Sequence, residues 1–580
     1  MSDAAIPSDS PAKSFARTLA QWFPRRAQFP CPKCNTELRR SPFYRKWRVC
    51  ENCGHHFPLT AYERVKTLAD PDTFHELEQF LSTHPRGIEY AQRVRAAKRE
   101  THLRESVIMG TAKIHAREVM LVVLDFRFLG GTMGATAGEK IARAFEVALE
   151  KNLPLIAFTA SGGARIQEGM NALMQMAKTV CAVNRFQEAR LPYITVLTHP
   201  TTGGVYASFA NLADVILAEP RALIGFAGPR VVEILTREKL PQDSHRAEFL
   251  LEHGMVDAIV PRHELRDAIG NIVANVKART LFSSVPAISK VAAGEEYRDT
   301  EGTLSSWSSV QLARHPNRPT TRDYITRIFS NFVELRGDHF FGEDPAIVCG
   351  VARLNDAMQT SFPLSPHQEV GMSQGVIVIG QERGNSETRT AHRGGRAEPE
   401  GYRKAQRLMR LASKWNLPLI TLIDTPGADA GYESEKRGIA MSLAYSISWM
   451  LKTRAPTIAV VIGEGGSGGA LALAAADRVA MLEHAVYSVI SPEGASAILY
   501  GDAAHAQELA DDLHLTARDL LKRNIIDAII DEPDGSANTN ADAAAQQVKA
   551  FLVNELATLA KQPIERLLEM RYAKYRTMGQ

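Results

Sequence analysis

The chain has 580 residues, more than one hydrophobic core can organise, so we expect two or three domains. Hydrophobic residues make up 45% of the chain and charged residues 23%, and the net charge of +3 gives no global electrostatic argument for nucleic-acid binding. No uninterrupted apolar run reaches the ~18 residues of a membrane span, and the first residues lack the apolar segment of a secretory signal. We therefore expect a cytoplasmic protein, with residues 1–26 as a flexible N-terminus.

Four of the six cysteines lie close together near the N-terminus, with the spacing of a zinc ribbon. Cys31 and Cys34 form one C-x2-C pair, Cys50 and Cys53 form the other, and fifteen residues separate the two pairs. Four thiolates complete a tetrahedral shell that leaves no position for a reacting water. The spacing predicts a structural Zn²⁺ site within residues 27–60, with four unrelated buried thiols as the alternative.

The rest of the chain contains the same pattern twice, which predicts an internal duplication. LPLIAFTASGGARIQ begins at Leu153 and LPLITLIDTPGADAG begins at Leu417, an offset of 417 − 153 = 264. Three further landmarks keep this offset within one residue: Pro192 and Pro456, Gly203-Gly204 and Gly468-Gly469, and Pro229 and Pro492. A period this long indicates a duplicated domain rather than a solenoid.

Each copy contains short apolar runs rich in β-branched residues, then glycines, then an alanine-rich helical segment. This order of strand, turn and helix predicts an α/β domain in each half. We expect the first domain at residues 61–293, a linker at 294–310 and the second domain at 311–580. The polar stretch at 355–374 is interpreted as an excursion between two strands.

Each half places glycines at two turns that follow apolar strands. A helix N-terminus presents unpaired N–H groups, and glycine lets a ligand atom come close to the backbone. Two N–H groups that converge on one oxygen form an oxyanion hole, which stabilises an enolate or a tetrahedral anion. The candidate catalytic residues are Gly162, Gly163, Gly203 and Gly204 in the first half, and Gly427, Ala428, Gly468 and Gly469 in the second. The alternative is that these residues serve only the close packing of helix on strand.

Residues 465–469 also fit the G-x-S-x-G pattern of a serine hydrolase, with Ser467 as nucleophile and with Asp477 and His484 following in hydrolase order. The first half has Thr-Thr-Gly-Gly at the matching place, so a hydrolase would leave that half without a role. The chain contains no GKS or GKT, which argues against a P-loop for ATP. The basic loop of the ribbon leaves a nucleic-acid-binding protein as another alternative, although a solvated face is preferred.

Several motifs resemble those of one known family. The ribbon, FRFLGGTMGATAGEK, ASGGARIQEG, LMQMAK, PTTGGVYASFA and ALIGFAGPRV resemble the β subunit of the bacterial acetyl-CoA carboxylase carboxyltransferase. From QLARHPNRP onward, DTPGA, GEGGSGGALAL and YSVISPEGASAI resemble its α subunit. The resemblance covers nearly the whole chain and implies a β–α fusion, with a crotonase-like ββα-superhelix domain in each half.

The resemblance implies a transferase that moves a carboxyl group from carboxybiotin to acetyl-CoA and yields malonyl-CoA for fatty acid biosynthesis. It implies two partners, because the biotin is supplied on a biotin carboxyl carrier protein and charged by a separate biotin carboxylase. A homodimer or a higher oligomer is implied as well. Neither a membrane nor a nucleic acid is expected as a partner.

The resemblance also implies roles for single residues. The helix-start pair of the first half is expected to hold the acyl-CoA carbonyl, and the pair of the second half the ureido oxygen of biotin. The residues of the preceding turns would be second donors, and Arg165, Lys178 and Arg437 are candidate contacts for the CoA phosphates. Two positions depart from the family pattern near the expected acyl pocket, Asp429-Ala430 and Tyr206. A carboxyltransferase or decarboxylase for another acyl-CoA, such as propionyl-CoA, is therefore the alternative within this class.

Overall fold

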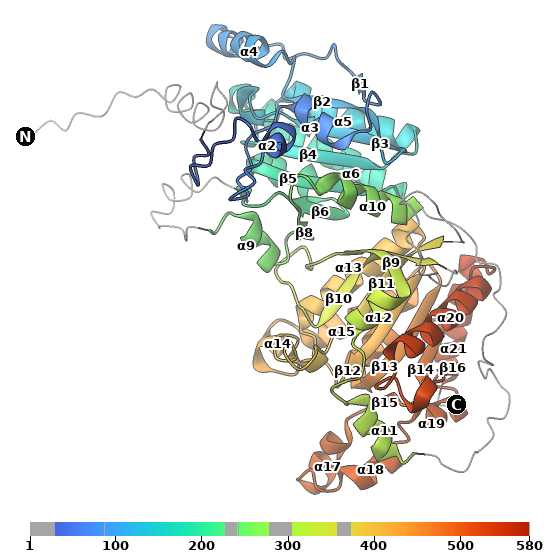
Figure 1. Cartoon of the computed structure of the whole chain (residues 1–580). Coiled ribbons are helices and arrows are strands. Elements are labelled where there is room, and N and C mark those ends of the chain that lie inside the picture. The colour runs from blue at the N-terminus through green and yellow to red at the C-terminus, as the bar shows by residue number, and fades with distance from the viewer. Residues whose placement is uncertain are drawn as a thin grey trace, which may run out of the picture. The chain divides into compact units, whose positions relative to one another are not determined.

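The computed structural model describes residues 30–85, 87–226, 241, 243–277, 304–355 and 373–578 (Figure 1). The expected flexible N-terminus at residues 1–26, Pro229 and most of the segments 294–310 and 355–374 lie outside these residues. Within the described part of the chain, no helix is both long enough and apolar enough to cross a membrane.

The chain divides into two compact units, which are described one at a time. The first unit holds residues 1–250 and 258–270, and the second holds residues 251–257 and 271–580. The predicted domain limits stay a prediction, because most of the predicted linker lies outside the described residues.

The first unit is built on one mixed sheet with the strand order β1-β2-β3-β4-β5-β6-β8, in which β7 pairs with β5. The pairs β1/β2 and β2/β3 are antiparallel, and the remaining pairs are parallel. The parallel strands are continuous apolar runs, as expected for strands that are buried on both faces. The strands are β1 His75–Leu77, β2 Val107–Ile114, β3 Arg117–Leu124, β4 Leu155–Ser161, β5 Tyr193–Thr202, β6 Val215–Ala218, β7 Ile224–Gly225 and β8 Ala258–Ile259.

The second unit repeats this topology with the order β9-β10-β11-β12-β13-β14-β16, in which β15 pairs with β13. Again the first two pairs are antiparallel and the others are parallel. The strands are β9 Phe329–Glu334, β10 Ile347–Asn355, β11 Ser373–Gln381, β12 Leu419–Thr425, β13 Thr457–Gly466, β14 Arg478–Leu482, β15 Val486–Ser488 and β16 Ala528–Ile530. The 355–374 excursion therefore lies between two paired strands, β10 and β11, as the sequence predicted.

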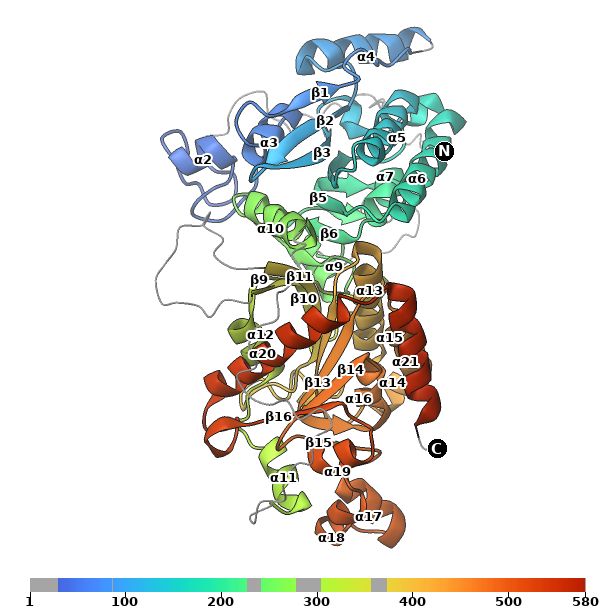
Figure 2. The ribbon, with the colours of Figure 1, turned by 90° about the vertical axis from the view of Figure 1, so that its right-hand side faces the viewer.

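The helices of the first unit are α2 Pro42–Trp47, α3 Ala61–Leu68, α4 Ile88–Thr101, α5 Ala135–Glu150, α6 Met170–Glu188 and α7 Gly203–Tyr206, and α9 Ala247–Glu252 and α10 Leu265–Lys277 cross the division. Helix α5 packs on β2, β3 and β4 and also on α6, whereas α3 packs on β2 and β3 (Figure 2). Helix α7 follows β5 directly and contacts β4 and β5. This places the start of α7 at the carboxyl ends of the two strands whose turns carry the candidate glycines.

The helices of the second unit are α11 Ser306–Ala313, α12 Thr321–Ile328, α13 Pro399–Trp415, α14 Tyr432–Lys436, α15 Ile439–Lys452, α16 Ser467–Ala474, α17 Pro492–Tyr500, α18 Ala506–Asp512, α19 Ala517–Lys522, α20 Ala541–Leu559 and α21 Ile564–Thr577. Helix α13 begins with proline at its first turn and ends at Asn416 in the left-handed conformation, two local signals that fix its limits. In Figures 1 and 2, α12 and α20 lie against one face of the sheet and α13 and α15 against the other. Helix α16 packs on β12 and β13, as α7 does on β4 and β5.

The two units keep the predicted offset. Strand β12 starts 419 − 155 = 264 residues after β4, strand β13 starts 457 − 193 = 264 after β5, and α13 starts 399 − 135 = 264 after α5. Strand order, strand directions and helix order also agree. The predicted duplication of one α/β domain is confirmed.

Candidate active site and metal centre

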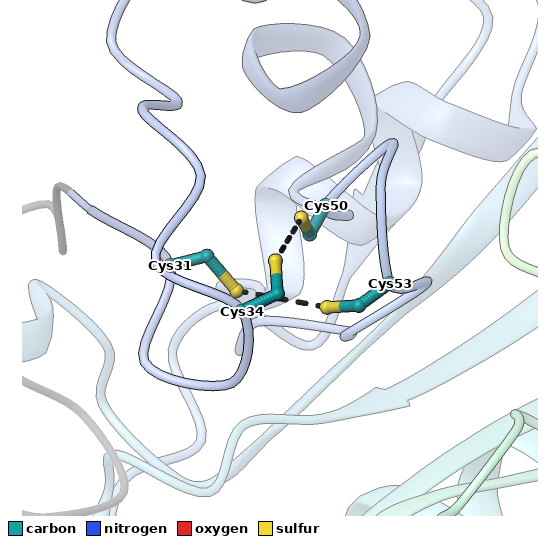
Figure 3. Close-up of side chains that lie close together, drawn as sticks. All are labelled: Cys31, Cys34, Cys50 and Cys53. Carbon is teal, nitrogen blue, oxygen red and sulfur yellow. Dashed lines mark hydrogen bonds between the residues drawn. The ribbon is translucent and has the colours of Figure 1, made fainter.

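The four ribbon cysteines form one compact cluster of sulfur atoms (Figure 3). Their Sγ atoms all lie within 4.8 Å of one another, with 3.7 Å between Cys31 and Cys53 and 3.6 Å between Cys34 and Cys50. Four sulfurs at Zn–S distances of about 2.3 Å in a tetrahedron are about 3.8 Å apart, so the cluster has the size that a zinc ion requires. His56 lies close to the cysteines in the sequence, but both of its ring nitrogens have other partners. Nδ1 lies 2.9 Å from the Gly54 carbonyl oxygen, and Nε2 accepts a hydrogen bond from the Arg262 amide.

In the first unit, the turn after β4 touches the start of α7. A Cβ added to Gly163 would lie 3.0 Å from the Cα of Gly203, and one added to Gly203 would lie 2.9 Å from the Cα of Gly163. Both residues have a positive φ, +107° and +61°, so neither position accepts another residue without strain. The structure thus brings together the two turns that the sequence singled out in the first half.

In the second unit, the turn after β12 touches the start of α16 in the same way. A Cβ added to Gly466 would lie 2.2 Å from the carbonyl carbon of Pro426, and one added to Gly469 would lie 2.4 Å from the amide nitrogen of Ala428. Each unit therefore presents a strand-end turn and a helix start in backbone contact. We call these pairs the first cradle (residues 162–164 and 203–204) and the second cradle (residues 426–428 and 466–469).

Some backbone amides of the first cradle already donate hydrogen bonds within the protein and therefore cannot donate to a ligand in this conformation. The Gly162 amide donates to the Gly130 carbonyl at 2.8 Å, and the Gly163 amide donates to Ser161 Oγ at 3.0 Å. The Gly203 amide donates to the Phe226 carbonyl at 3.0 Å. These three predicted donors already have acceptors in this conformation, so they hold the backbone of the cradle.

The Ala164 amide is a candidate donor that sequence reasoning missed. Met133 and Ala164 form an isolated parallel β-bridge. In it the Met133 amide donates to the Gly163 carbonyl and the Arg165 amide donates to the Met133 carbonyl, so the Ala164 amide takes no part in the bridge. Its nitrogen lies 3.5 Å from the point where a Cβ of Gly204 would stand. Ala164 and Gly204, at the second position of α7, are thus neighbours, and they are the better candidate donors of the first cradle.

The second cradle repeats this arrangement. The Gly427 amide donates to Thr425 Oγ1 at 3.1 Å, as the Gly163 amide does to Ser161. The predicted residue Ala428 corresponds to Ala164, because 428 − 164 = 264. The constant offset was the signal that could have identified Ala164 from the sequence.

The register of the two helix starts differs by one residue from the predicted pairing of the glycines. Gly203 and Ser467 are the first residues of α7 and α16, both have a positive φ, and 467 − 203 = 264. Gly204 therefore corresponds to Gly468, and Gly469 corresponds to Val205. The predicted match of Gly203-Gly204 with Gly468-Gly469 is corrected to this register.

Comparison with known proteins agrees with this geometry. A family model described as acetyl co-enzyme A carboxylase carboxyltransferase-like matches residues 255–579. A protein of Natranaerobius thermophilus named acetyl-coenzyme A carboxylase carboxyl transferase subunits beta/alpha is 43% identical over 565 residues, which covers 95% of this chain and 91% of that protein. This chain belongs to the acetyl-CoA carboxylase carboxyltransferase family.

A protein of the same printed name from Clostridium tetani is 41% identical over 553 residues, 95% of this chain and 92% of that protein. Among solved structures, transcarboxylase 12S superposes with a TM-score of 0.68 at 21% identity and covers 87% of this chain and 90% of that chain. These matches confirm the predicted β–α order of the carboxyltransferase halves and the crotonase-like fold, preceded by a cysteine cluster of the zinc-ribbon type.

The serine hydrolase alternative fails on the position of its acid. Both carboxylate oxygens of Asp477 accept from Arg571, at 2.8 and 2.7 Å, and the amide and hydroxyl of Thr457 donate to the same carboxylate. The Asp477 carboxylate thus joins α21 to β13, and these bonds occupy the oxygens that a catalytic acid would use to orient a histidine. The positive φ of Ser467, +53°, has its counterpart in Gly203 of the same carboxyltransferase fold, so it needs no nucleophile to explain it.

Of the three cations predicted for the CoA phosphates, Arg165 cannot reach a ligand in this conformation. Its side chain and that of Glu105 are both 0% exposed, and its guanidinium bonds Glu105, the Thr132 carbonyl and Thr132 Oγ1. Burial alone would raise the pKa of Glu105, but Arg165 outweighs it and holds that pKa below its ordinary value. Arg165 is a buried support behind the first cradle, which corrects the prediction for this residue.

The other two cations are accessible and already paired. Lys178 lies 3.0 Å from Glu139 on the exposed surface of α6 and α5. Arg437 lies 3.0 Å from both Glu398 and Glu400 and is about a quarter exposed. The Lys178–Glu139 pair is exposed, and such a pair is weak and can exchange for a phosphate. The Glu400 partner of Arg437 is only 4% exposed, so that pair is held more firmly. Both positions stay predictions.

A small cavity with a volume of about 10 Å³ adjoins the second cradle. Arg314 lies on its lining and binds two carboxylates, Glu464 at 2.7 Å and Glu493 at 2.6 Å. Burial would lower the pKa of Arg314, but the bonds to these glutamates raise it, so it remains a cation. The remaining lining residues are Val310, Gly465, Gly466, Val486, Ser488, Ile490, Ser491, Pro492 and Leu515.

Proposed function

We propose that this chain is the carboxyltransferase component of a biotin-dependent acyl-CoA carboxylase and that acetyl-CoA is its acceptor, which yields malonyl-CoA for fatty acid biosynthesis. The names of its relatives support the reaction class. The observation that carries the proposal is the duplicated cradle, because each unit aligns a strand-end turn with a helix start in backbone contact. Two such cradles suit a reaction in which both partners develop an enolate-like oxyanion.

In this proposal the amides of Ala164 and Gly204 donate to the thioester carbonyl of the acyl-CoA. They would stabilise the enolate oxygen that forms when the α-carbon loses its proton. The amides of Ala428, Gly468 and Gly469 would donate to the ureido oxygen of biotin, which supplies the carboxyl group from a carrier protein. Neither cradle needs an acidic or basic side chain for this role, since backbone donors do not titrate.

Zinc is proposed as a structural cofactor of the ribbon. Four thiolates would complete the shell, which leaves no coordination position for a reacting water. Leu38, Tyr44 and Phe57 pack around Cys31 and Cys50, and a core this small is the kind that a metal stabilises. The four cysteines of the cluster would therefore hold the fold and take no part in the transfer.

The proposed partners are a biotin carboxyl carrier protein and a biotin carboxylase as separate chains. We also propose a homodimer or higher oligomer. Lys178 and Arg437 are proposed contacts for the CoA phosphates, and a cytoplasmic location stays a prediction from the sequence.

The assay that tests the function is the reverse reaction. Full-length protein is mixed with malonyl-CoA and either free biotin or a biotinylated carrier, without ATP, and acetyl-CoA is measured by liquid chromatography. Biotin-dependent formation of acetyl-CoA is expected. Methylmalonyl-CoA in a parallel series tests the propionyl alternative, and no turnover of either thioester with either biotin source contradicts the proposal.

A further inference from the structure

Two of the proposed donors of the second cradle, the amides of Gly468 and Gly469, lie on the first turn of helix α16. Its sequence is SGGALALA, so no side chain after Ser467 carries a polar group. A helix of eight residues is too short to be stable alone, and its orientation has to come from its neighbours. One such contact lies at the far end, where Thr421 Oγ1 donates to the Leu473 carbonyl at 2.7 Å.

At the cradle end, two buried side chains bind one carbonyl of α16. Gln381 Nε2 donates to the Gly469 carbonyl at 2.8 Å, and Tyr402 Oη donates to the same oxygen at 3.3 Å. Both side chains are 0% exposed. Gln381 is the last residue of β11 and Tyr402 lies in the first turn of α13, so two separate elements converge on Gly469.

This contact also sets the distance between the two parts of the second cradle. A Cβ on Gly469 would lie 2.9 Å from Tyr402 Oη and 2.4 Å from the Ala428 nitrogen. The tyrosine hydroxyl and the 427–428 turn thus both lie close to the Cα of Gly469. Because helix carbonyls point along the axis away from the N-terminus, fixing this carbonyl fixes the direction of the N–H groups ahead of it.

The side-chain amide of Gln381 is only partly satisfied by hydrogen bonds. Among the described residues, its Oε1 has no hydrogen-bond partner although the side chain is fully buried. A buried amide with an unpaired oxygen destabilises a protein, so Gln381 holds this position at a cost in stability.

We propose that Gln381 and Tyr402 are positioning residues that fix the backbone donors of the second cradle through the Gly469 carbonyl. The inference rests on the proposed function, since it names what holds the cradle that faces biotin. Burial raises the pKa of the Tyr402 hydroxyl, so the group remains a protonated donor throughout the pH range of an assay.

The corresponding positions of the first unit do not provide these two donors. With the offset 402 − 138 = 264, the counterpart of Tyr402 is Gly138. The pairing of β3 with β4 and of β11 with β12 sets the β3/β11 offset at 381 − 124 = 257, so the counterpart of Gln381 is Leu124. Neither glycine nor leucine has a side-chain hydrogen-bond donor. Loss of Gln381 or Tyr402 should therefore disturb the biotin side of the reaction and leave acyl-CoA binding unchanged.

The test compares Tyr402→Phe and Gln381→Met with Tyr324→Phe. Tyr324 is also 0% exposed in the second unit, and among the described residues its hydroxyl has no partner, which makes it a matched control. The readouts are kcat and KM for malonyl-CoA in biotin-dependent decarboxylation, with thermal unfolding as a check of the fold. Since removing one oxyanion donor costs about 100- to 1000-fold, loosening the donors should cost about tenfold for Tyr402→Phe and up to about 100-fold for Gln381→Met, in kcat.

The inference is supported if kcat falls in both variants, KM for malonyl-CoA stays within about twofold of wild type, and Tyr324→Phe retains wild-type kcat. It is overturned if the folded variants keep wild-type kcat, if the loss lies in KM for malonyl-CoA, or if Tyr324→Phe loses as much. An inactive wild-type protein would instead overturn the proposed function, and this inference with it, so the two failures are distinct.

Discussion

Alanine at Gly469 should disrupt the second cradle, whereas alanine at the neighbouring Gly468 should not. Neither glycine has a positive φ, so the backbone conformation permits alanine at both positions. The difference lies in space. A Cβ at Gly468 meets nothing closer than Leu443 Cδ1 at 3.9 Å, whereas a Cβ at Gly469 would lie 2.4 Å from the backbone nitrogen of Ala428.

The magnitudes follow from these distances. Alanine is favoured over glycine in a helix by about 0.5–1 kcal/mol, so Gly468→Ala should be neutral or slightly stabilising. At Gly469 the turn at Ala428 would have to move by about 1 Å to reach an ordinary contact, and overpacking of this kind costs about 1–3 kcal/mol. We expect Gly469→Ala to be about 1–3 kcal/mol less stable than Gly468→Ala, because the helix term applies to both glycines of α16 and only the overpacking separates the variants.

Both variants are measured by urea unfolding followed by circular dichroism, and by kcat in the reverse assay. Movement of the Ala428 amide away from α16 should lower kcat of Gly469→Ala on the order of 100-fold. Equal stability of the two alanine variants would refute the argument from backbone contact. Wild-type kcat in Gly469→Ala would refute the role of this contact in the cradle.

Two further predictions concern the buried ion pair and the ribbon. The folded-state pKa of Glu105 is lowered, so its pairing with Arg165 stabilises the protein above the ordinary value of 4.5 and is lost as the pH falls below it. Glu105→Gln should cost about 3–5 kcal/mol at pH 7 and should flatten the acid limb of the stability curve; an unchanged curve would contradict the pairing. Metal analysis should find one zinc per chain, and Cys34→Ser should lose it together with thermal stability; a metal-free protein of wild-type stability would argue against a structural zinc.

The sequence by itself determined the features that depend on short spacings. The C-x2-C pairs predict a ribbon because each pair spans a single turn, and four sulfurs do lie together in the structure. The offset of 264 predicts two copies of one domain, because strands, turns and helices are set by local runs of residues. Membership of the carboxyltransferase family follows from these same motifs.

Only the tertiary structure decided which backbone donors are available. The Gly162 amide is satisfied by Gly130 and the Gly203 amide by Phe226, partners that no local pattern specifies. From the sequence alone, Arg165 is as good a candidate for binding a phosphate as any other arginine. Only the structure shows that its side chain is buried against Glu105.

The support of the second cradle was equally hidden in the sequence. Gln381 lies 88 residues before Gly469, and Tyr402 lies 67 residues before it. Their bonds to one carbonyl arise because β11, α13 and α16 converge at the carboxyl end of the sheet. Spacing along the chain fixes which elements form, whereas packing between elements fixes where each hydrogen bond goes.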